Sequence, residues 1–260
     1  MNDIKMKTNY SAGVILIHRA SKDIQIIMIK RRFSYAFGDF INDRYSKINV
    51  FDSLAHMFRF MTAEEKAIIS SNSAANIFYH YWLVNPTDSL CPVDVATRYK
   101  SFSTRFNALI RHDMGKQLNE LLIRTPCISC LDLFEFPKGK VKQGEESIVA
   151  AKRELKEETN YNENNYVLYD DIKAFTYILN AADNGEVYMT DYYIGEVTIP
   201  NAHTSLKMTD WSQKIEVSEI RRFNINTIRD IFPHYRNVCD YIMTVLEVKP
   251  IPIQCVNVKF

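Results

Sequence analysis

Three glutamates at helical spacing are the side chains in this sequence that could most directly do chemistry. Glu154, Glu157 and Glu158 stand at positions i, i+3 and i+4, so a helix would bring their carboxylates onto one face. Like charges at that spacing destabilise a helix unless a cation neutralises them. Clustered carboxylate oxygens are the ligands that divalent ions such as Mg²⁺ and Mn²⁺ prefer, and such ions bind phosphates. Taken alone, such a run is more often a solvated acidic helix face.

The residues before these glutamates predict a strand, a loop and a helix. Residues 131–136 are apolar and typical of a strand, which Pro137 and Gly139 end. The helix is expected to begin at Ser147, because serine is a good N-cap residue and two acids precede it near the positive end of the helix dipole. Lysines in the loop would face the glutamates.

The full spacing resembles the signature of the Nudix hydrolases. Gly139 is followed after five residues by Glu145, and after seven more by the run 153–159, which fills every charged position of that signature. One position departs, because Asn160 stands where the family has glycine. Asparagine is the next-best residue for the left-handed end of a helix, so we interpret the change as conservative. The resemblance implies an α+β Nudix fold, with a mixed β-sheet between helices.

Composition places few limits on partners. The chain has 260 residues, 47% of them hydrophobic, and a net charge of +1, so any nucleic-acid surface must be a local patch. Five cysteines and a polar N-terminus predict a reducing compartment without a signal peptide. Cys127 and Cys130 form a lone CxxC with no second pair at a zinc-like spacing, so no metal role is expected for them. No apolar run is long enough for a membrane span.

A long gap before the signature predicts an inserted domain. Residues 10–18 and 24–32 are predicted strands joined by a hairpin, yet the signature begins only at Gly139. The intervening residues are mostly helical in pattern. We predict the following organisation: a first Nudix segment over 1–36, an inserted helical RNA-binding domain over 37–125, and a Nudix domain with the catalytic helix over 126–260.

The insertion contains three predicted helices, and the third is basic. Thr62 and Glu65 fit a capping box between the first two helices. The basic residues of the third helix form either a solvated face or a patch for a phosphate backbone. The three helices are expected at 51–62, 63–82 and 95–123. The basic residues are Arg98, Lys100, Arg105, Arg111 and Lys116.

The likeness extends beyond the signature to the mRNA-decapping Nudix enzymes of large cytoplasmic DNA viruses. That resemblance implies metal-dependent hydrolysis of the 7-methylguanosine cap to 7-methyl-GDP and 5′-monophosphate RNA, in the cytoplasm of an infected host cell. The alternative substrates are diphosphoinositol polyphosphates or dinucleoside polyphosphates, and a homodimer is left open. A catalytically dead Nudix module is disfavoured by the intact glutamates. The matching stretches are 11–15, 30–37, 61–62, 78–82 and 136–140.

Hydrolysis of a pyrophosphate needs charge neutralisation and an aligned water, and the signature residues divide these roles. Glu154 and Glu158 are predicted metal ligands. Glu157 either ligates the metal or deprotonates the water. Arg153 is expected to orient the glutamates by ion pairing, and Glu145 to support the loop or a second metal.

Further contacts are expected outside the catalytic helix. Lys138 and Lys140 are predicted to bind RNA, and a later acid is predicted to join the metal site, with Glu216 as first candidate and Glu219 and Asp171 as alternatives. A methylated cap base is flat and cationic, so an aromatic ring beside a carboxylate would hold it. The aromatic candidates are Phe33, Tyr35 and Phe37.

Overall fold

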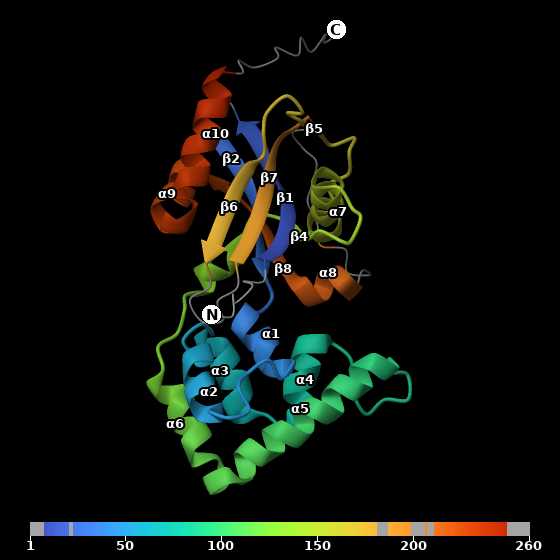
Figure 1. Cartoon of the computed structure of the whole chain (residues 1–260), viewed down its shortest axis with the longest axis vertical. Helices are drawn as coiled ribbons and strands as arrows, with labels where there is room; N and C mark the ends of the chain where they lie inside the picture. The colour runs from blue at the N-terminus through green and yellow to red at the C-terminus, as the bar shows by residue number, and fades with distance from the viewer. Residues whose placement is uncertain (1–7, 21–22, 181–186, 199–205, 207–210, 249–260) are drawn as a thin grey trace, which may run out of the picture. The chain divides into compact units, whose positions relative to one another are not determined.

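The computed structural model describes residues 8–20, 23–180, 187–198, 206 and 211–248, which divide into two compact units (Figure 1). The sheet unit takes its residues from 1–29, 136–205 and 220–260. The helical unit takes residues 30–135 and 206–219. The predicted insertion, 37–125, falls within the helical unit. Among the described residues, no helix is both long and apolar enough to cross a lipid bilayer.

The sheet unit is built on a mixed β-sheet. Its strands are β1 (Thr8–Ala20), β2 (Asp23–Arg31), β4 (Lys138–Lys140), β5 (Tyr166–Leu168), β6 (Phe175–Asn180), β7 (Val187–Val197) and β8 (Val217–Asn224). The main path is β2-β1-β7-β5, while β4 pairs with β1, β6 with β7 and β8 with β2. β1 runs parallel to β7 and antiparallel to β2 and β4, and β7 is antiparallel to β5 and β6. The predicted first hairpin is therefore present, although its turn lies outside the described residues.

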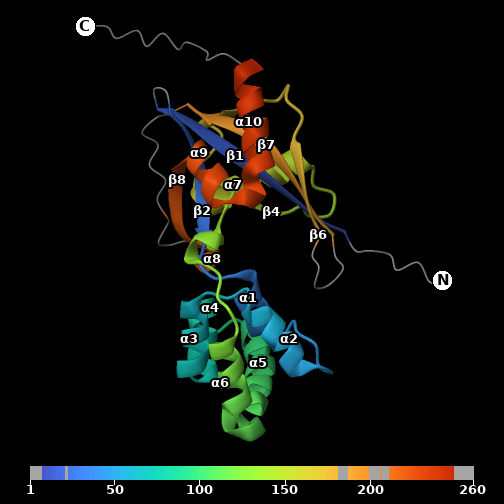
Figure 2. The ribbon, with the colours of Figure 1, turned by 90° about the vertical axis from the view of Figure 1, so that its left-hand side faces the viewer.

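Helices cover both faces of this sheet, with α7 (Ser147–Thr159) on one side and α10 (Arg236–Val248) on the other (Figures 1 and 2). Ala150, Ala151 and Leu155 of α7 are fully buried in one cluster with Ala12 and Val14 of β1. Burying one leucine side chain contributes about 1.5–3 kcal/mol. The predicted α+β fold, a mixed sheet between helices, is confirmed.

The amphipathic pattern of 226–246 predicts one long helix, with Ile231, Val238, Tyr241, Ile242 and Val245 facing inward. That prediction is wrong, because the chain breaks there. α9 (Ile225–Ile231) ends before the 3₁₀ turn η3 (Pro233–Tyr235), and α10 begins afterwards. Proline has no N–H to continue the helix. Ile231 is expected to face inward in a single helix, but as the last residue of α9 it is 43% exposed. The expected inward residues beyond the break, Val238, Ile242 and Val245, are buried.

The helical unit has a core of aromatic rings. Phe37, Phe40, Phe58, Phe78 and Phe102 are at most 1% exposed, and several of them meet edge to face. Figure 2 shows α3, α6 and α5 side by side in this unit. Its helices are α1 (Tyr35–Ile41), α2 (Val50–Phe58), α3 (Ala63–Ser71), α4 (Ala74–Trp82), α5 (Val93–Arg111), α6 (Lys116–Arg124) and α8 (Trp211–Glu216). The shorter elements are η1 (His112–Gly115), η2 (Cys130–Leu133) and β3 (Phe134–Glu135).

Three predicted elements of this unit are divided differently in the structure. The helix expected over 63–82 is two helices, because Ser73 caps a new helix by accepting from the Asn76 N–H. The helix expected over 95–123 breaks at residues 113–115, which all have positive φ. Lys116 therefore begins α6 and does not share a helix with the other predicted basic residues. The strand expected over 131–136 starts with η2, which Ser129 caps.

Two adjacent buried charges tie the helical unit together. The Glu65 carboxylate accepts the Thr62 N–H at 2.8 Å, completing the predicted capping box of α3, and also the Ser34 N–H at 2.5 Å at the start of α1. Burial raises the pKa of Glu65. The Lys66 ammonium donates to Thr125 O and Oγ1, both at 2.7 Å, and to Pro126 O at 2.9 Å. Every one of these bonds joins segments distant in the sequence or satisfies a helix end.

Candidate active site

A short strand, a loop and α7 hold the predicted signature residues. β4 pairs with β1, so Gly139 lies opposite Ala12. α7 has Glu146 as its N-cap residue, and Asn160 ends it with φ 63° and ψ 8°, the left-handed conformation expected there. The expected N-cap at Ser147 is wrong by one residue, since the Ser147 hydroxyl instead donates to Asp191 Oδ2 at 3.1 Å.

Gly139 is required for space. A Cβ atom built on this residue would lie 2.0 Å from Glu154 Cδ and 2.2–2.3 Å from its two carboxylate oxygens. The carboxylate of Glu154 therefore lies directly against the backbone of β4. Any side chain at position 139 would occupy the volume that Glu154 fills.

Arg153 binds three carboxylates at once. Its Nε and Nη2 contact the two oxygens of Glu145 at 2.9 and 3.0 Å, a bidentate pair. Its Nη1 donates to Glu154 Oε1 at 2.5 Å and to Glu157 Oε2 at 3.2 Å. Its Nη2 also donates to the Lys140 carbonyl at 3.1 Å. These bonds lower the pKa of Glu145 to about 2 and raise the pKa of Arg153.

The three glutamates of α7 have different surroundings. Glu154 is partly buried, and burial raises its pKa although Arg153 acts in the opposite direction. Glu158 is 6% exposed, and its Oε2 accepts the Lys138 N–H at 2.9 Å. The Glu157 side chain is 54% exposed, so it is the one most open to water and substrate.

The donor set fits a divalent ion, although its oxygens do not converge. Among the described residues, no three His, Cys, Asp or Glu side chains come together closely enough to hold a metal ion. The reason is that the guanidinium of Arg153 lies between Glu154 and Glu157, while Glu158 turns toward β4. Carboxylate oxygens are the hard ligands that such an ion prefers. Arg153 binds one oxygen each of Glu154 and Glu157, so the other oxygen of each carboxylate is not bound by this guanidinium.

The other predicted acids lie on separate elements. Glu216 ends α8 of the helical unit, and its carbonyl accepts the Arg32 N–H at 2.8 Å. Glu219 lies on β8, and Asp171 is exposed in a turn after β5. Their membership of the metal site stays a prediction.

The predicted basic residues also differ in their surroundings. Lys138 and Lys140 lie on β4 beside the signature loop. Arg105 is partly buried and pairs with Asp43 at 3.6 Å, so it fastens the loop after α1. Arg98 is exposed and donates to Asn42 Oδ1 at 3.3 Å. The other three members are exposed, and in the described part of the chain their side chains have neither an ion pair nor a hydrogen bond. They are Lys100, Arg111 and Lys116.

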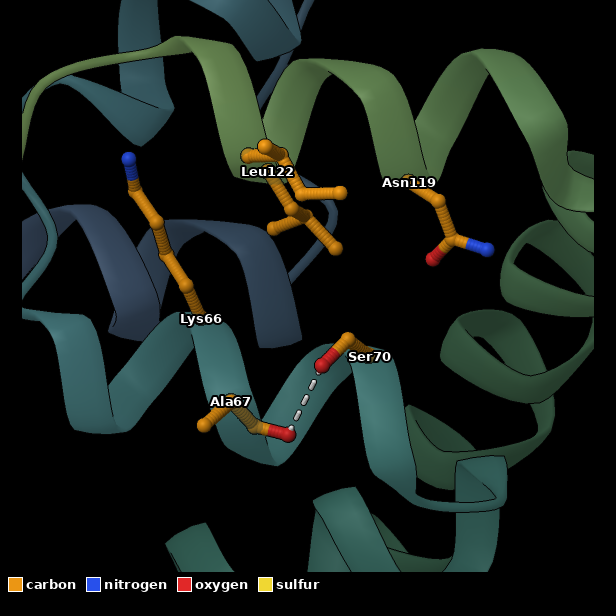
Figure 3. Close-up of a pocket in the computed structure, with 6 residues that line it drawn as sticks. Lys66, Ala67, Ser70, Asn119 and Leu122 are labelled. Atoms are coloured by element: carbon orange, nitrogen blue, oxygen red, sulfur yellow. Dashed lines mark hydrogen bonds between the residues drawn. The ribbon is translucent and has the colours of Figure 1, made fainter.

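A groove lies between α3 and α6, and none of the predicted site residues lines it. Figure 3 shows Ser70 donating to the Ala67 carbonyl within one turn of α3, with Leu122 above them. The one charged group there, Lys66, already has three oxygen partners. The lining residues are Lys66, Ala67, Ser70, Asn119, Leu122 and Ile123.

Asp191 is a residue of the site that sequence reasoning missed. It lies on β7, and its two carboxylate oxygens accept the hydroxyls of Ser147 and Thr176 at 3.1 and 2.8 Å. No local pattern marks it, since it is 44 residues from Ser147 in the chain. Only the pairing of the strands brings it to the first turn of α7.

Comparisons with known proteins find a matching family profile, curated relatives and solved structures. A NUDIX domain profile matches residues 103–238. The mRNA-decapping protein g5R of African swine fever virus, from a Kenyan pig isolate, is 28% identical over 232 residues, covering 89% of this chain and 90% of the relative. The same protein from a South African tick isolate is also 28% identical over 232 residues, covering 88% and 89%. A crystal structure of a C. elegans Ap4A hydrolase binary complex aligns with a TM-score of 0.42 and 12% identity, over 91% of this chain and 98% of that one.

Replacing Gly139 tests the space requirement. In Gly139→Ala the new methyl group would displace the Glu154 carboxylate, so Mn²⁺ binding is expected to weaken roughly 10–100-fold, as for other changes that disturb metal ligands indirectly. Mn²⁺ affinity is measured on the purified protein by titration. Val149→Ala is the control, because it removes an exposed side chain of α7 outside the signature contacts. Equal Mn²⁺ affinity in Gly139→Ala and the parent protein would contradict this account.

Proposed function

Because the chain belongs to the NUDIX family, we propose that it is a hydrolase that removes the cap from mRNA and uses Mg²⁺ or Mn²⁺. Water would add to a phosphorus atom of the cap, and cleavage of the P–O bond would release 7-methyl-GDP and RNA with a 5′-monophosphate. The observation that carries the proposal is the set of glutamates on α7 gathered by Arg153 over Gly139. The likeness to viral decapping proteins over most of the chain supports the substrate. The same likeness supports a reaction in the cytoplasm of an infected cell.

In the proposed mechanism the charged signature residues of α7 have different tasks. Glu154 and Glu158 would hold the divalent ion, which would supply positive charge for the bridging phosphates when bound. Glu157, the most exposed of the three glutamates, would either join them as a ligand or accept a proton from the attacking water. Arg153 keeps its bidentate bond to Glu145, which anchors the guanidinium beside the other carboxylates.

Tyr35 is the aromatic residue that best suits a methylated cap base. Of the three candidates, Phe37 is fully buried and Phe33 stacks on it at 4.7 Å, whereas Tyr35 is 59% exposed. The planar cation of Arg31 lies 3.2 Å from the Tyr35 ring centroid, and the Tyr35 hydroxyl lies 3.4 Å from both oxygens of Glu135. The 7-methylguanine base is also a flat cation, so it would compete with Arg31 for this ring beside the Glu135 carboxylate.

Lys100 and Arg111 are the residues of α5 best placed to hold the RNA chain. They are eleven residues apart, about three helical turns, so they share a face. Both are exposed, while Phe102 and Phe106 on the opposite face are buried. Arg105 is committed to Asp43 and is left out of this role. Two phosphates of a single strand could lie along this face.

The catalytic assignment is tested with Glu157→Gln. The amide keeps the size of the side chain but cannot accept a proton, so release of 7-methyl-GDP from cap-labelled RNA is expected to fall roughly 10²–10⁴-fold. Glu163→Gln is the control, since it removes the same charge from an exposed side chain outside α7. Near-parental turnover of Glu157→Gln at saturating Mn²⁺ would contradict the assignment. Failure of the parent protein to release 7-methyl-GDP would overturn decapping itself.

The cap site is tested by binding without hydrolysis. In the absence of metal, Tyr35→Ala is expected to bind 7-methyl-GTP roughly 10–100-fold more weakly, because base stacking on a ring contributes about 1–3 kcal/mol. Tyr35→Phe keeps the ring and should bind nearly as well as the parent. Tyr79→Ala removes another exposed ring of the helical unit and serves as control. Unchanged affinity in Tyr35→Ala would exclude this ring.

The RNA-chain contact is tested with the double variant Lys100→Glu/Arg111→Glu. Its affinity for uncapped single-stranded RNA should fall, and the slope of log affinity against log salt should decrease by about 0.7 for each lost phosphate contact. The matched control is Lys47→Glu/Arg59→Glu, an equal charge change at exposed positions of the same unit. Hydrolysis of a compact inositol pyrophosphate should survive in the first variant. Loss of both activities together would mean that the face supports the fold or the catalytic helix.

A further inference from the structure

One row of residues crosses four strands beneath α7. Gly139 of β4 lies opposite Ala12 of β1, which lies opposite Asp191 of β7, which lies opposite Thr176 of β6. Residues paired across neighbouring strands point to the same face of a sheet. Ala12 is buried in one cluster with Ala151 of α7. The whole row therefore faces α7.

Two contacts of α7 fall on this row, at distances that match. Glu154 lies against Gly139, and Ser147 donates to Asp191 Oδ2 at 3.1 Å. Ser147 and Glu154 are seven residues apart, so two helical turns separate them by about 10.5 Å on one helix face. Gly139 and Asp191 are two strands apart, which is about 9.6 Å. The helix therefore meets the sheet with both contacts formed together, and a shift along its axis would break both.

The apolar packing beneath α7 combines small and large side chains. Ala150 and Ala151 have single methyl groups that interlock little, whereas Leu155 packs in the same cluster as Val14 and Tyr161. Polar contacts add a directional constraint to this packing. Glu158 accepts the Lys138 N–H at 2.9 Å near the end of α7, and Asp191 binds the first turn.

Asp191 is itself fixed in direction. Its Oδ1 accepts the Thr176 hydroxyl at 2.8 Å from the neighbouring strand β6, which leaves Oδ2 to accept from Ser147. Both oxygens are thus bound to hydroxyl donors on two different elements. The carboxylate connects α7 to two strands of the sheet.

We propose that Asp191 is a positioning residue that sets the register of α7 on the sheet, through Ser147, and thereby places the Glu154 carboxylate in the space left by Gly139. Its two carboxylate oxygens accept the hydroxyls of Ser147 and Thr176, so it would act through α7. The inference rests on the proposed function for its catalytic readout. Its binding readout uses the metal alone and is independent of the RNA substrate.

The test compares Ser147→Ala and Asp191→Ala with the conservative variants Ser147→Thr and Asp191→Asn, which keep a donor and an acceptor at these positions. In the alanine variants the Mn²⁺ affinity, titrated without substrate, is expected to fall roughly 10-fold, in the range seen when a partner of a metal ligand is lost. With capped RNA, kcat should fall by a similar factor while KM changes by less than about twofold. The conservative variants should recover most of both losses.

A control separates positioning from stability. Val149→Ala lies on the exposed side of α7, so it should keep Mn²⁺ affinity within about threefold of the parent. Alanine variants that melt at a lower temperature but retain parental Mn²⁺ affinity and kcat would overturn the proposal. A different outcome would separate the two proposals. If the parent protein does not release 7-methyl-GDP but the alanine variants still bind Mn²⁺ more weakly than the parent, the positioning role stands and decapping is rejected.

Discussion

The candidate active site depends on one guanidinium that bonds to three carboxylates. Glu145, Glu154 and Glu157 would repel one another, and the repulsion would be strongest at Glu154, which is partly buried against β4. Arg153 reduces that repulsion by binding all three, with the bidentate pair to Glu145 as its fixed end. Its single positive charge leaves the three carboxylates with a net negative charge, which favours a divalent cation as a further partner. Under the proposed function, binding of that ion would weaken part of the ion-pair network.

Small residues let the helix approach closely enough for that network to form. Gly139 leaves room for Glu154, and Ala12 and Ala151 allow α7 to lie directly on β1. Such an interface has few interlocking side chains, so directional hydrogen bonds at Ser147 and Glu158 become more important than in a leucine-rich interface. The same small residues therefore make room for the Glu154 carboxylate and reduce the interlocking between α7 and the sheet.

Local features of the fold could be predicted from the sequence, and long-range ones could not. The grouping of the glutamates, the left-handed end at Asn160 and the capping box at Thr62 depend on residues a few positions apart. The break at residues 113–115 has positive φ at two non-glycine residues, which no propensity indicates. The bond between Ser147 and Asp191 and the pairing of Arg105 with Asp43 follow from strand register and helix packing, which bring distant segments together.

The partnering of the basic residues limits how the protein can hold RNA. The sequence shows five basic residues over 98–116, but Arg105 is tied to Asp43 and Arg98 to Asn42. Only a few cations then remain for phosphates, in keeping with a net charge of +1. Each phosphate contact adds about 0.7 to the salt slope for a single strand, so with few contacts the proposed RNA face would bind weakly at physiological salt. Under the proposed function, selection of a capped end would then come chiefly from the cap and the proposed metal site, and the RNA chain would add binding energy that positions the cap for hydrolysis.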